Sequence, residues 1–233
     1  MGGISRYDDH LDVIARCRCL QALCRDVCAQ IARRATSQRH GTRSFLFRRG
    51  DRADSFFVIA EGVVYTSLLS SSGREFISCV AGPGDLVGAA AYFDGAPREA
   101  DCTVMTPLRV VSVPYSAGRA LHSTLLDDLL CQVVCRQWRA VLAQTGSLAL
   151  DELDVRLAKV LCMLDMQGEG IEAMHPRHFH QGLIAAMANG SRPKINRQLQ
   201  RFHRAGAIAL RGGAITSVDR DKLSALVRAA EMK

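Results

Sequence analysis

Short apolar runs separated by turn signals dominate the first half of the chain. Each run is followed by residues such as Gly, Asp or Ser that favour turns, and the runs are Phe45–Phe47, Phe56–Ala60, Val63–Leu69 and Phe76–Ala81. Short strands with turns of this kind are typical of an antiparallel sandwich or barrel. We predict an α+β protein whose residues 1–115 form a sensor domain: a leading helical segment over Leu11–Arg34 and then an antiparallel, jelly-roll-like β-roll.

A long, weakly charged helical pattern follows in residues 116–150. Leu129–Leu150 contains only two charged residues, and apolar residues recur every seven positions. A helix with so wide an apolar face must bury it, and a helix of a second chain is a suitable partner. We predict a dimerisation helix here, with packing on its own domain as the alternative. The expected interface residues are Leu130, Val134, Gln137, Val141 and Leu148.

Residues 151–233 show helical periodicity and end in a hairpin pattern. Leu153, Leu157 and Leu161 mark a first helix, and Leu183–Ala188 marks a second. Ile195, Leu199 and Phe202 mark a third helix. Two short apolar runs on either side of Gly212-Gly213 predict a terminal β-hairpin. We treat this region as one domain.

The segment Gln181–Leu199 has the pattern of a helix-turn-helix. Asn189-Gly190 predicts the turn because both residues tolerate positive φ, and Ser191 is a favourable N-cap for the following helix. Ile195 and Leu199 would face the core, leaving polar side chains outward where base edges lie in a complex. The residues expected to contact DNA are Gln181, Ser191, Arg192, Lys194, Asn196, Arg197 and Arg201.

The charge distribution supports an anionic partner. The net charge is +7, and no Asp or Glu occurs between Glu172 and Asp219. Seven basic residues lie in that stretch: Arg177, Arg192, Lys194, Arg197, Arg201, Arg204 and Arg211. An acid-free basic segment suits contact with phosphates, whereas an ordinary solvated face mixes both signs. The pattern therefore predicts binding to double-stranded DNA.

These residues closely resemble the CRP/FNR family of bacterial transcription regulators. The resemblance rests on Gln181–Leu199 with Arg204–Ile208, and on Val155–Leu161, which is similar to the helix that opens the family's DNA-binding domain. Upstream, Gly50-Asp51, Phe57–Ile59, Glu61-Gly62 and Gly82–Gly88 resemble its cyclic-nucleotide-binding-type β-roll. The resemblance implies a sensor β-roll, a dimerisation helix, a winged helix-turn-helix, two-fold-symmetric DNA and contact with RNA polymerase. Pro193 stands where many members carry Glu, so the target sequence is expected to differ.

The resemblance also implies a sensor pocket with altered chemistry. Its candidate residues are Gly88, Ala89, Arg98, Glu99, Val141 and Leu142. Ala89 replaces the Glu that binds ribose in cyclic-AMP-binding relatives, and Glu99 replaces a phosphate-binding Ser and could pair with Arg98. Val141 and Leu142 replace hydroxyl side chains that contact adenine. We therefore expect that cyclic AMP is not a tight ligand, and the effector stays unknown.

Cysteines near the N-terminus leave other sensing chemistries open. Cys17, Cys19, Cys24 and Cys28 resemble the N-terminal ligands of FNR-type iron–sulfur sensors, but their spacing falls inside the helix predicted for this segment. Small, semi-buried apolar side chains are the simpler interpretation. Control by an iron–sulfur cluster, by heme or by cysteine thiols is therefore the alternative. His175, His178 and His180 lack a nearby carboxylate or thiol partner, and we expect no metal there.

Composition excludes several other classes of protein. A cupin-type enzyme needs clustered His and Glu ligands, yet no histidine occurs between Phe45 and Tyr115, so we expect no enzymatic activity. Nine scattered cysteines and the absence of a signal sequence or an apolar run of membrane-spanning length predict a cytoplasmic protein without a membrane partner. A regulatory subunit that keeps the fold without binding DNA is a further alternative.

Overall fold

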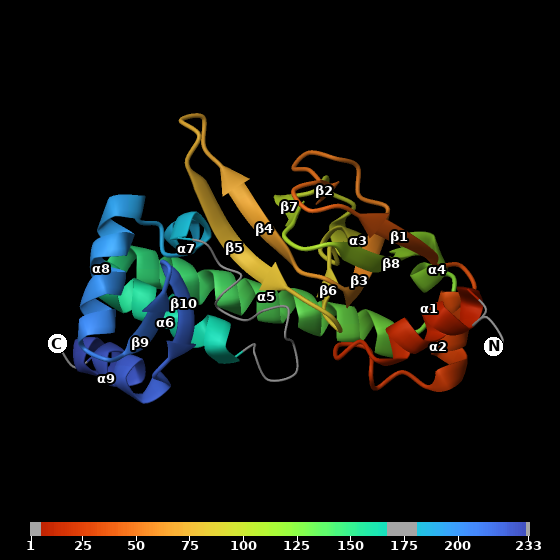
Figure 1. The fold of residues 1–233 in the computed structure, drawn as a ribbon. Helices are drawn as coiled ribbons and strands as arrows, with labels where there is room; N and C mark the ends of the chain where they lie inside the picture. The colour runs from red at the N-terminus through yellow and green to blue at the C-terminus, as the bar shows by residue number, and fades with distance from the viewer. Residues whose placement is uncertain (1–5, 167–180, 232–233) are drawn as a thin grey trace. The chain divides into compact units, whose positions relative to one another are not determined.

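The computed structural model describes residues 6–166 and 181–231 (Figure 1). The chain forms two compact units, each described here by itself. Of the described residues, those up to Ser67 together with Cys79–Ala140 form the first unit. Leu68–Ser78 and the residues from Val141 onward form the second. Within the described part of the chain, no helix combines the length and apolarity that crossing a membrane requires.

Two four-stranded antiparallel sheets form the β-roll. One has the order β1 (Thr36–His40), β8 (Leu108–Pro114), β3 (Ser55–Glu61) and β6 (Leu86–Val87). The other has the order β2 (Phe45–Phe47), β7 (Asp101–Val104), β4 (Val64–Leu69) and β5 (Glu75–Ala81). The short helix α3 (Ala91–Asp94) follows β6. The predicted α+β class with an antiparallel β-roll is confirmed.

Strand β3 is buried on both faces, which explains its uninterrupted apolar run. Phe57 and Ile59 lie in a core with side chains of both sheets, including Phe47 and Val64. Phe56 and its neighbour two residues on, Val58, lie in a second core that also contains helical residues. Because successive strand side chains point to opposite faces, a strand between two cores must be apolar at every position.

The N-terminal segment forms two helices and a connecting loop, so the single helical segment expected over Leu11–Arg34 is wrong. Helix α1 spans Arg6–Ala15 and α2 spans Arg25–Ala32. Within the loop, the Cys17 amide donates to the Ile14 carbonyl at 3.1 Å, and the Leu20 amide donates to the Cys17 carbonyl at 2.9 Å. Leu20 and Cys17 are completely buried. The loop is thus an ordered part of the first unit's core.

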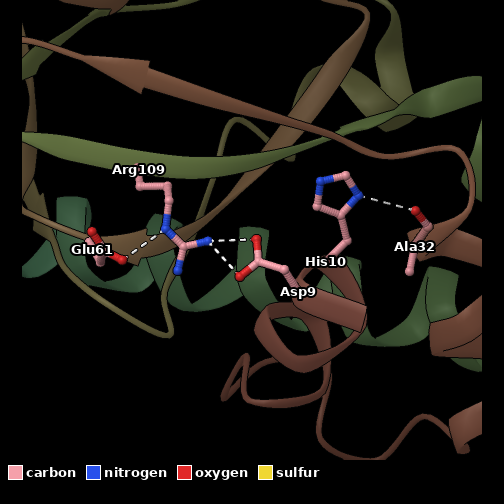
Figure 2. A network of polar contacts seen from close by, with 5 residues as sticks. All are labelled: Asp9, His10, Ala32, Glu61 and Arg109. Atoms are coloured by element: carbon pink, nitrogen blue, oxygen red, sulfur yellow. Dashed lines mark hydrogen bonds and ion pairs between the residues drawn. The ribbon is translucent and has the colours of Figure 1, made fainter. Parts of the chain in front are cut away.

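An ion-pair network fixes α1 to the sheet (Figure 2). The Arg109 guanidinium on β8 reaches Asp9 on α1 at 2.8 Å and Glu61 on β3 at 2.9 Å. Next to it, the buried ring of His10 lies 3.4 Å, through Nδ1, from the carbonyl of Ala32 at the end of α2. These contacts hold both leading helices, and therefore the loop between them, against the β-roll.

The long helix α5 begins later than the predicted boundary at residue 116. The short helix α4 (Tyr115–Arg119) comes first, and α5 then runs over Thr124–Leu150 (Figure 1). Leu126, Leu130 and Val133 on α5 are buried in the core of the first unit. The first turns of α5 therefore pack on their own domain, which was the alternative interpretation for this helix.

The second unit contains helices around a two-stranded hairpin. Its elements are α6 (Leu153–Met166), α7 (Gln181–Met187), α8 (Arg192–Arg204), β9 (Ile208–Arg211), β10 (Ala214–Val218) and α9 (Arg220–Glu231). The predicted helices and the hairpin are present, and α9 adds a terminal helix that packs against α6 (Figure 1). Leu157, Leu161, Ile195, Leu199 and Ile215 are almost completely buried and form part of its interior.

Candidate functional site

Helices α7 and α8 form the predicted helix-turn-helix, with a tight turn between them. Asn189 adopts positive φ of 47°, and the Gly190 amide donates to the Ala185 carbonyl at 2.9 Å. Gly190 itself does not have positive φ, although we expected from the sequence that this glycine would be needed for that conformation. A Cβ at Gly190 would lie 2.9 Å from Cδ1 of Leu153 and 3.0 Å from Cδ1 of Ile195. Close packing, and not backbone conformation, explains this glycine.

Helix α8 separates an apolar side from a basic one. Ile195, Leu199 and Phe202 are buried. The outward residues are all exposed, and they are Ser191, Arg192, Lys194, Asn196, Arg197 and Arg201. This division follows from apolar residues at spacings of three and four in a helix. The structure therefore brings the predicted DNA-contacting side chains of α8 to its exposed surface.

The polar side chains at the start of α8 and beside it differ in their hydrogen bonds. Ser191 occupies the N-cap position with extended backbone, but its side chain makes no capping hydrogen bond. The Gln181 side chain at the start of α7 donates to the Asn196 side chain at 3.5 Å. Arg201 donates to Gln198 one turn earlier at 3.1 Å. Gln181 thus lies beside α8, and the Ser191 hydroxyl does not cap the helix.

The basic side chains of α8 have no counter-ions among residues 6–166 and 181–231. No carboxylate there lies within 4.0 Å of Arg192, Lys194, Arg197 or Arg201, although ion pairs form elsewhere in the same unit, as between Lys159 and Asp151 at 2.8 Å. Unneutralised guanidinium and ammonium groups on one helix face suit a polyanion. Arg177, His175, His178 and His180 lie outside the described residues.

The hairpin β9–β10 has the form of a wing. Gly212 and Gly213 both adopt positive φ, of 59° and 81°, as a type I′ turn requires. Arg211, beside this turn, is exposed. The amide of Ala207, just before β9, donates to the Phe202 carbonyl at 2.9 Å, and this hydrogen bond connects the start of the hairpin to α8.

In the first unit, Arg98 is turned into the protein interior. It is 4% exposed, and its guanidinium donates to the carbonyls of Ser55 at 2.6 Å and Gly88 at 3.0 Å, and to the Tyr115 hydroxyl at 3.2 Å. The Phe47 ring centre lies 4.4 Å from it. Burial raises the pKa of the Tyr115 hydroxyl, against the lowering effect of Arg98, so this group stays protonated and donates to the Gly88 carbonyl at 2.6 Å.

The other expected pocket residues differ in exposure. Ala89 is buried at 1% exposure, and Glu99 is exposed and makes no ion pair with Arg98 within the described ranges, so the pairing considered from sequence is wrong. Arg98 prefers carbonyl acceptors that the β-roll itself supplies. Val141 and Leu142 belong to the second unit and are 37% and 56% exposed.

The expected dimer residues fall into two groups on α5. Leu130 has no exposed surface, so placing it at the interface is wrong: it packs inside its own domain. Val134, Gln137 and Leu148 are half-buried, and Val141 is exposed. The sequence interpretation missed Trp138, which is 64% exposed and lies four residues after Val134, on the same side of the helix. That spacing was the available signal.

The four N-terminal cysteines do not gather into a set of ligands. No group of three or more His, Cys, Asp or Glu side chains that could hold a metal occurs in the described part of the chain. Cys17 and Cys28 are buried, Cys19 is half-exposed and Cys24 is exposed. Cys17 and Cys19 lie in the loop, and Cys24 and Cys28 lie at the start of α2 and within it, so the single helix assumed from sequence does not apply.

Comparison with known families and proteins matches both units. Residues 38–124 match the cyclic nucleotide-binding domain, and residues 155–226 match the Crp-like helix-turn-helix domain. The chain is similar to the CRP-like cAMP-activated global transcriptional regulator of Mycobacterium tuberculosis, with 27% identity over 190 residues that cover 78% of this chain and 84% of the relative. It is 26% identical over 141 residues to the cAMP-activated global transcriptional regulator CRP of Escherichia coli O157:H7, covering 59% and 66% of the two chains.

Solved structures share the fold. FixK2 from Bradyrhizobium japonicum aligns with a TM-score of 0.73 at 18% identity, covering 82% of this chain and 96% of that one. The c-di-GMP-responsive regulator CLP of Xanthomonas campestris aligns with a TM-score of 0.69 at 20% identity, covering 83% and 98%. With the two domain matches in this order, and a basic helix in the second that has no counter-ion among the described residues, the chain belongs to the CRP/FNR family, whose members are DNA-binding transcription regulators and not enzymes.

Proposed function

We propose that the protein is a homodimeric, cytoplasmic regulator that binds two-fold-symmetric DNA through α8, contacts RNA polymerase and does not use cyclic AMP as a tight ligand. The observation that carries the DNA part is the exposed face of α8, where Arg192, Lys194 and Arg197 lack counter-ions among the described residues. Asn196 and the three cations offer donors of the kinds that read guanine and adenine edges. Two symmetric half-sites would follow from two copies of α8.

Selection of bound DNA by the purified protein, followed by affinity measurements on the selected site, tests this reading. Arg197→Ala should weaken specific binding by about 10- to 100-fold, since a bidentate base contact contributes about 1–3 kcal/mol. The fold should be unchanged because Arg197 is exposed. Arg220→Ala, an exposed arginine at the start of α9, is the matched control. Unchanged affinity of Arg197→Ala for the selected site would contradict the assignment.

A dimer through α5 explains its uncovered apolar surface. Trp138, Val141 and Leu142 are exposed in the single chain at 64%, 37% and 56%. They follow the part of α5 that is buried in its own domain, so the interface would begin after Val133 and include Val134, Gln137, Val141 and Leu148. A second copy of the same helix offers a matching face, as symmetric dimers require.

The state of Arg98 supports the proposal about cyclic AMP. A cyclic phosphate would have to draw the guanidinium away from two carbonyls, a hydroxyl and the Phe47 ring. Ala89 supplies no acceptor for a ribose hydroxyl, and Glu99 adds a negative charge near the phosphate. Titration calorimetry should therefore give a dissociation constant for cyclic AMP that is above about 1 µM, which corresponds to a binding free energy weaker than about 8 kcal/mol. A dissociation constant below that limit would overturn this part.

A thiol-based sensor is the second candidate, and the contacts of Cys19 favour it over heme or an iron–sulfur cluster. The Cys19 sulfur accepts a hydrogen bond from an arginine of α5. No comparable set of three metal-binding side chains exists among the residues described. Anaerobic purification with iron and heme assays distinguishes these chemistries: bound iron or heme would favour a cofactor-based sensor.

A further inference from the structure

Cys17 and Cys19 lie on either side of one residue in a tight turn. They flank Arg18 in the loop between α1 and α2, where the Leu20 amide closes the turn by donating to the Cys17 carbonyl at 2.9 Å. Each thiol affects the pKa of the other. Cys17 is completely buried and Cys19 is half-exposed. The Cys19 sulfur is thus partly accessible to a small reagent, and the buried Cys17 is only two residues away.

Helix α5 supplies a cation to the accessible sulfur. The Arg136 guanidinium donates to Sγ of Cys19 at 3.3 Å. The loop is held on its other side, where Arg18 pairs with Asp85 at 2.5 Å and the Arg18 amide donates to the Gly84 carbonyl at 3.0 Å. Arg18 therefore forms an ion pair with Asp85, and Arg136 is the arginine that contacts the Cys19 sulfur.

These contacts make the two thiols unequal. The neighbouring Cys17 thiol and the charge and hydrogen bond of Arg136 lower the pKa of Cys19, while burial and Asp85 act in the opposite direction. The neighbouring Cys19 thiol and burial raise the pKa of Cys17. A thiolate is the nucleophile in cysteine oxidation, so Cys19 would attack and Cys17 would resolve.

We propose that Cys17 and Cys19 form a peroxide-sensitive dithiol site, in which Cys19 is oxidised first and Cys17 then closes an intramolecular disulfide. The Cys19 thiolate attacks a hydroperoxide, its O–O bond breaks, and Cys19 sulfenic acid forms with release of water or an alcohol once a proton is taken up. The Cys17 thiol then attacks the sulfenic sulfur, an S–S bond forms, and the sulfenic oxygen leaves as water. The hydroperoxide is reduced by two electrons and the dithiol is oxidised by two.

The short separation along the chain is compatible with this bond. A disulfide needs Cα atoms about 4.4–6.8 Å apart, a range that residues two positions apart in a tight turn satisfy. Closing it would move Sγ of Cys19 from Arg136 toward Cys17, so Arg136 would lose its hydrogen bond to the loop. Arg136 lies about 200° around α5 from Val134, because each helical residue turns about 100°. The site therefore remains accessible when a second chain covers the proposed dimer face.

Oxidation of the full-length, reduced protein by limiting hydrogen peroxide tests the proposal. Differential alkylation and peptide mass spectrometry should find the Cys17–Cys19 disulfide before any other thiol changes. Cys24 is the internal control, since it is more exposed than Cys19. If exposure alone governs reactivity, Cys24 will be oxidised first, and the proposal is then wrong. A disulfide that joins Cys19 to any cysteine other than Cys17 would also overturn it.

Variants of Arg136 test whether its positive charge activates the Cys19 thiol or whether the side chain only supports the fold. Arg136→Gln should slow alkylation of Cys19 by about tenfold, because the thiolate loses its neighbouring cation. Arg136→Lys should restore most of the rate, and alkylation of Cys24 should be unchanged in both. Equal rates for Cys19 in wild type and Arg136→Gln would exclude the proposed role. Cys17→Ala should leave Cys19 sulfenic acid that dimedone traps, and a Cys19 disulfide in that variant would contradict the resolving role of Cys17.

Discussion

At the scale of single residues, contacts distinguish similar side chains that sequence cannot separate. Arg98, Arg136 and Arg197 are all arginines in regions with predicted functions. Arg98 is buried on carbonyls, Arg136 donates to a sulfur, and Arg197 is exposed without an ion pair among the described residues. The role of each follows from its neighbours: Arg98 holds the β-roll together, Arg136 activates a thiol, and Arg197 is available to DNA.

Gly190 gives a prediction at this scale. A Cβ there would meet Cδ1 of Leu153 at 2.9 Å and Cδ1 of Ile195 at 3.0 Å, so these two side chains would have to shift in a tightly packed place. Gly190→Ala should lower the free energy of unfolding by about 1–3 kcal/mol, as overpacked sites do. Urea unfolding followed by circular dichroism measures this. Gly146→Ala, at a helical glycine with open space around it, should instead stabilise by up to about 1 kcal/mol.

At the scale of elements, periodic apolar patterns predicted most of the fold. The strands at Phe45–Phe47 and Phe56–Ala60 and the helices of the second unit occur close to their expected positions. Strand β1 was not expected, because Thr36–His40 is polar and lies at a sheet edge. The interruption between α1 and α2 was also missed, since loop residues such as Cys17 and Leu20 are as apolar and buried as helical ones.

The predicted sites show the same limit. The exposed side of α8 could be predicted because it depends only on helical spacing. The positions of Leu130 and Arg98 could not, because the partners that bury them, such as Phe56 and Tyr115 from β3 and the start of α4, are distant in sequence. Local pattern therefore identified the DNA-binding helix, whereas the sensor region and the dimer face depend on tertiary contacts.

The joint between α5 and α6 gives a prediction at the element scale. The Asp151 carboxylate accepts from Lys159 at 2.8 Å and from Ser147. Burial acts to raise the pKa of Asp151, but the hydrogen bonds from Lys159 and Ser147 outweigh it, so the pKa is lowered. Because the folded-state pKa lies below the unfolded one, the stabilisation is present at neutral pH and is lost as pH falls through the folded value.

Asp151→Asn should therefore destabilise the protein at pH 7 by about 1 kcal/mol, a value discounted for the partial exposure of Lys159. The difference from wild type should shrink as pH falls below about 4. Thermal unfolding over a pH series measures it. Glu152→Gln changes an exposed neighbour and should have little effect. A destabilisation of Asp151→Asn that is equal at pH 7 and pH 3 would contradict the ionic origin.

At the scale of the whole molecule, the apolar surface of α5 is the feature that a single chain leaves unexplained. Trp138 is 64% exposed and Leu142 is 56% exposed, and they lie four residues apart. Soluble monomers rarely leave large apolar side chains together on one helix, and such patches mark interaction sites. A two-fold axis beside this helix would bury the patch and present two copies of α8 to the two half-sites of symmetric DNA.

The double variant Val141→Asp with Leu142→Asp tests this arrangement. Both side chains are exposed in the single chain, so the charges should leave each chain folded, whereas at the interface of two chains they would be buried without partners. Sedimentation should show a dimer for wild type and a monomer for the variant, which should also lose affinity for symmetric DNA. Leu125→Asp places the same charge at an exposed leucine on another side of α5 and should remain dimeric. A variant that stays dimeric would place the interface elsewhere on the molecule, and the exposed part of α5 would then need a different partner.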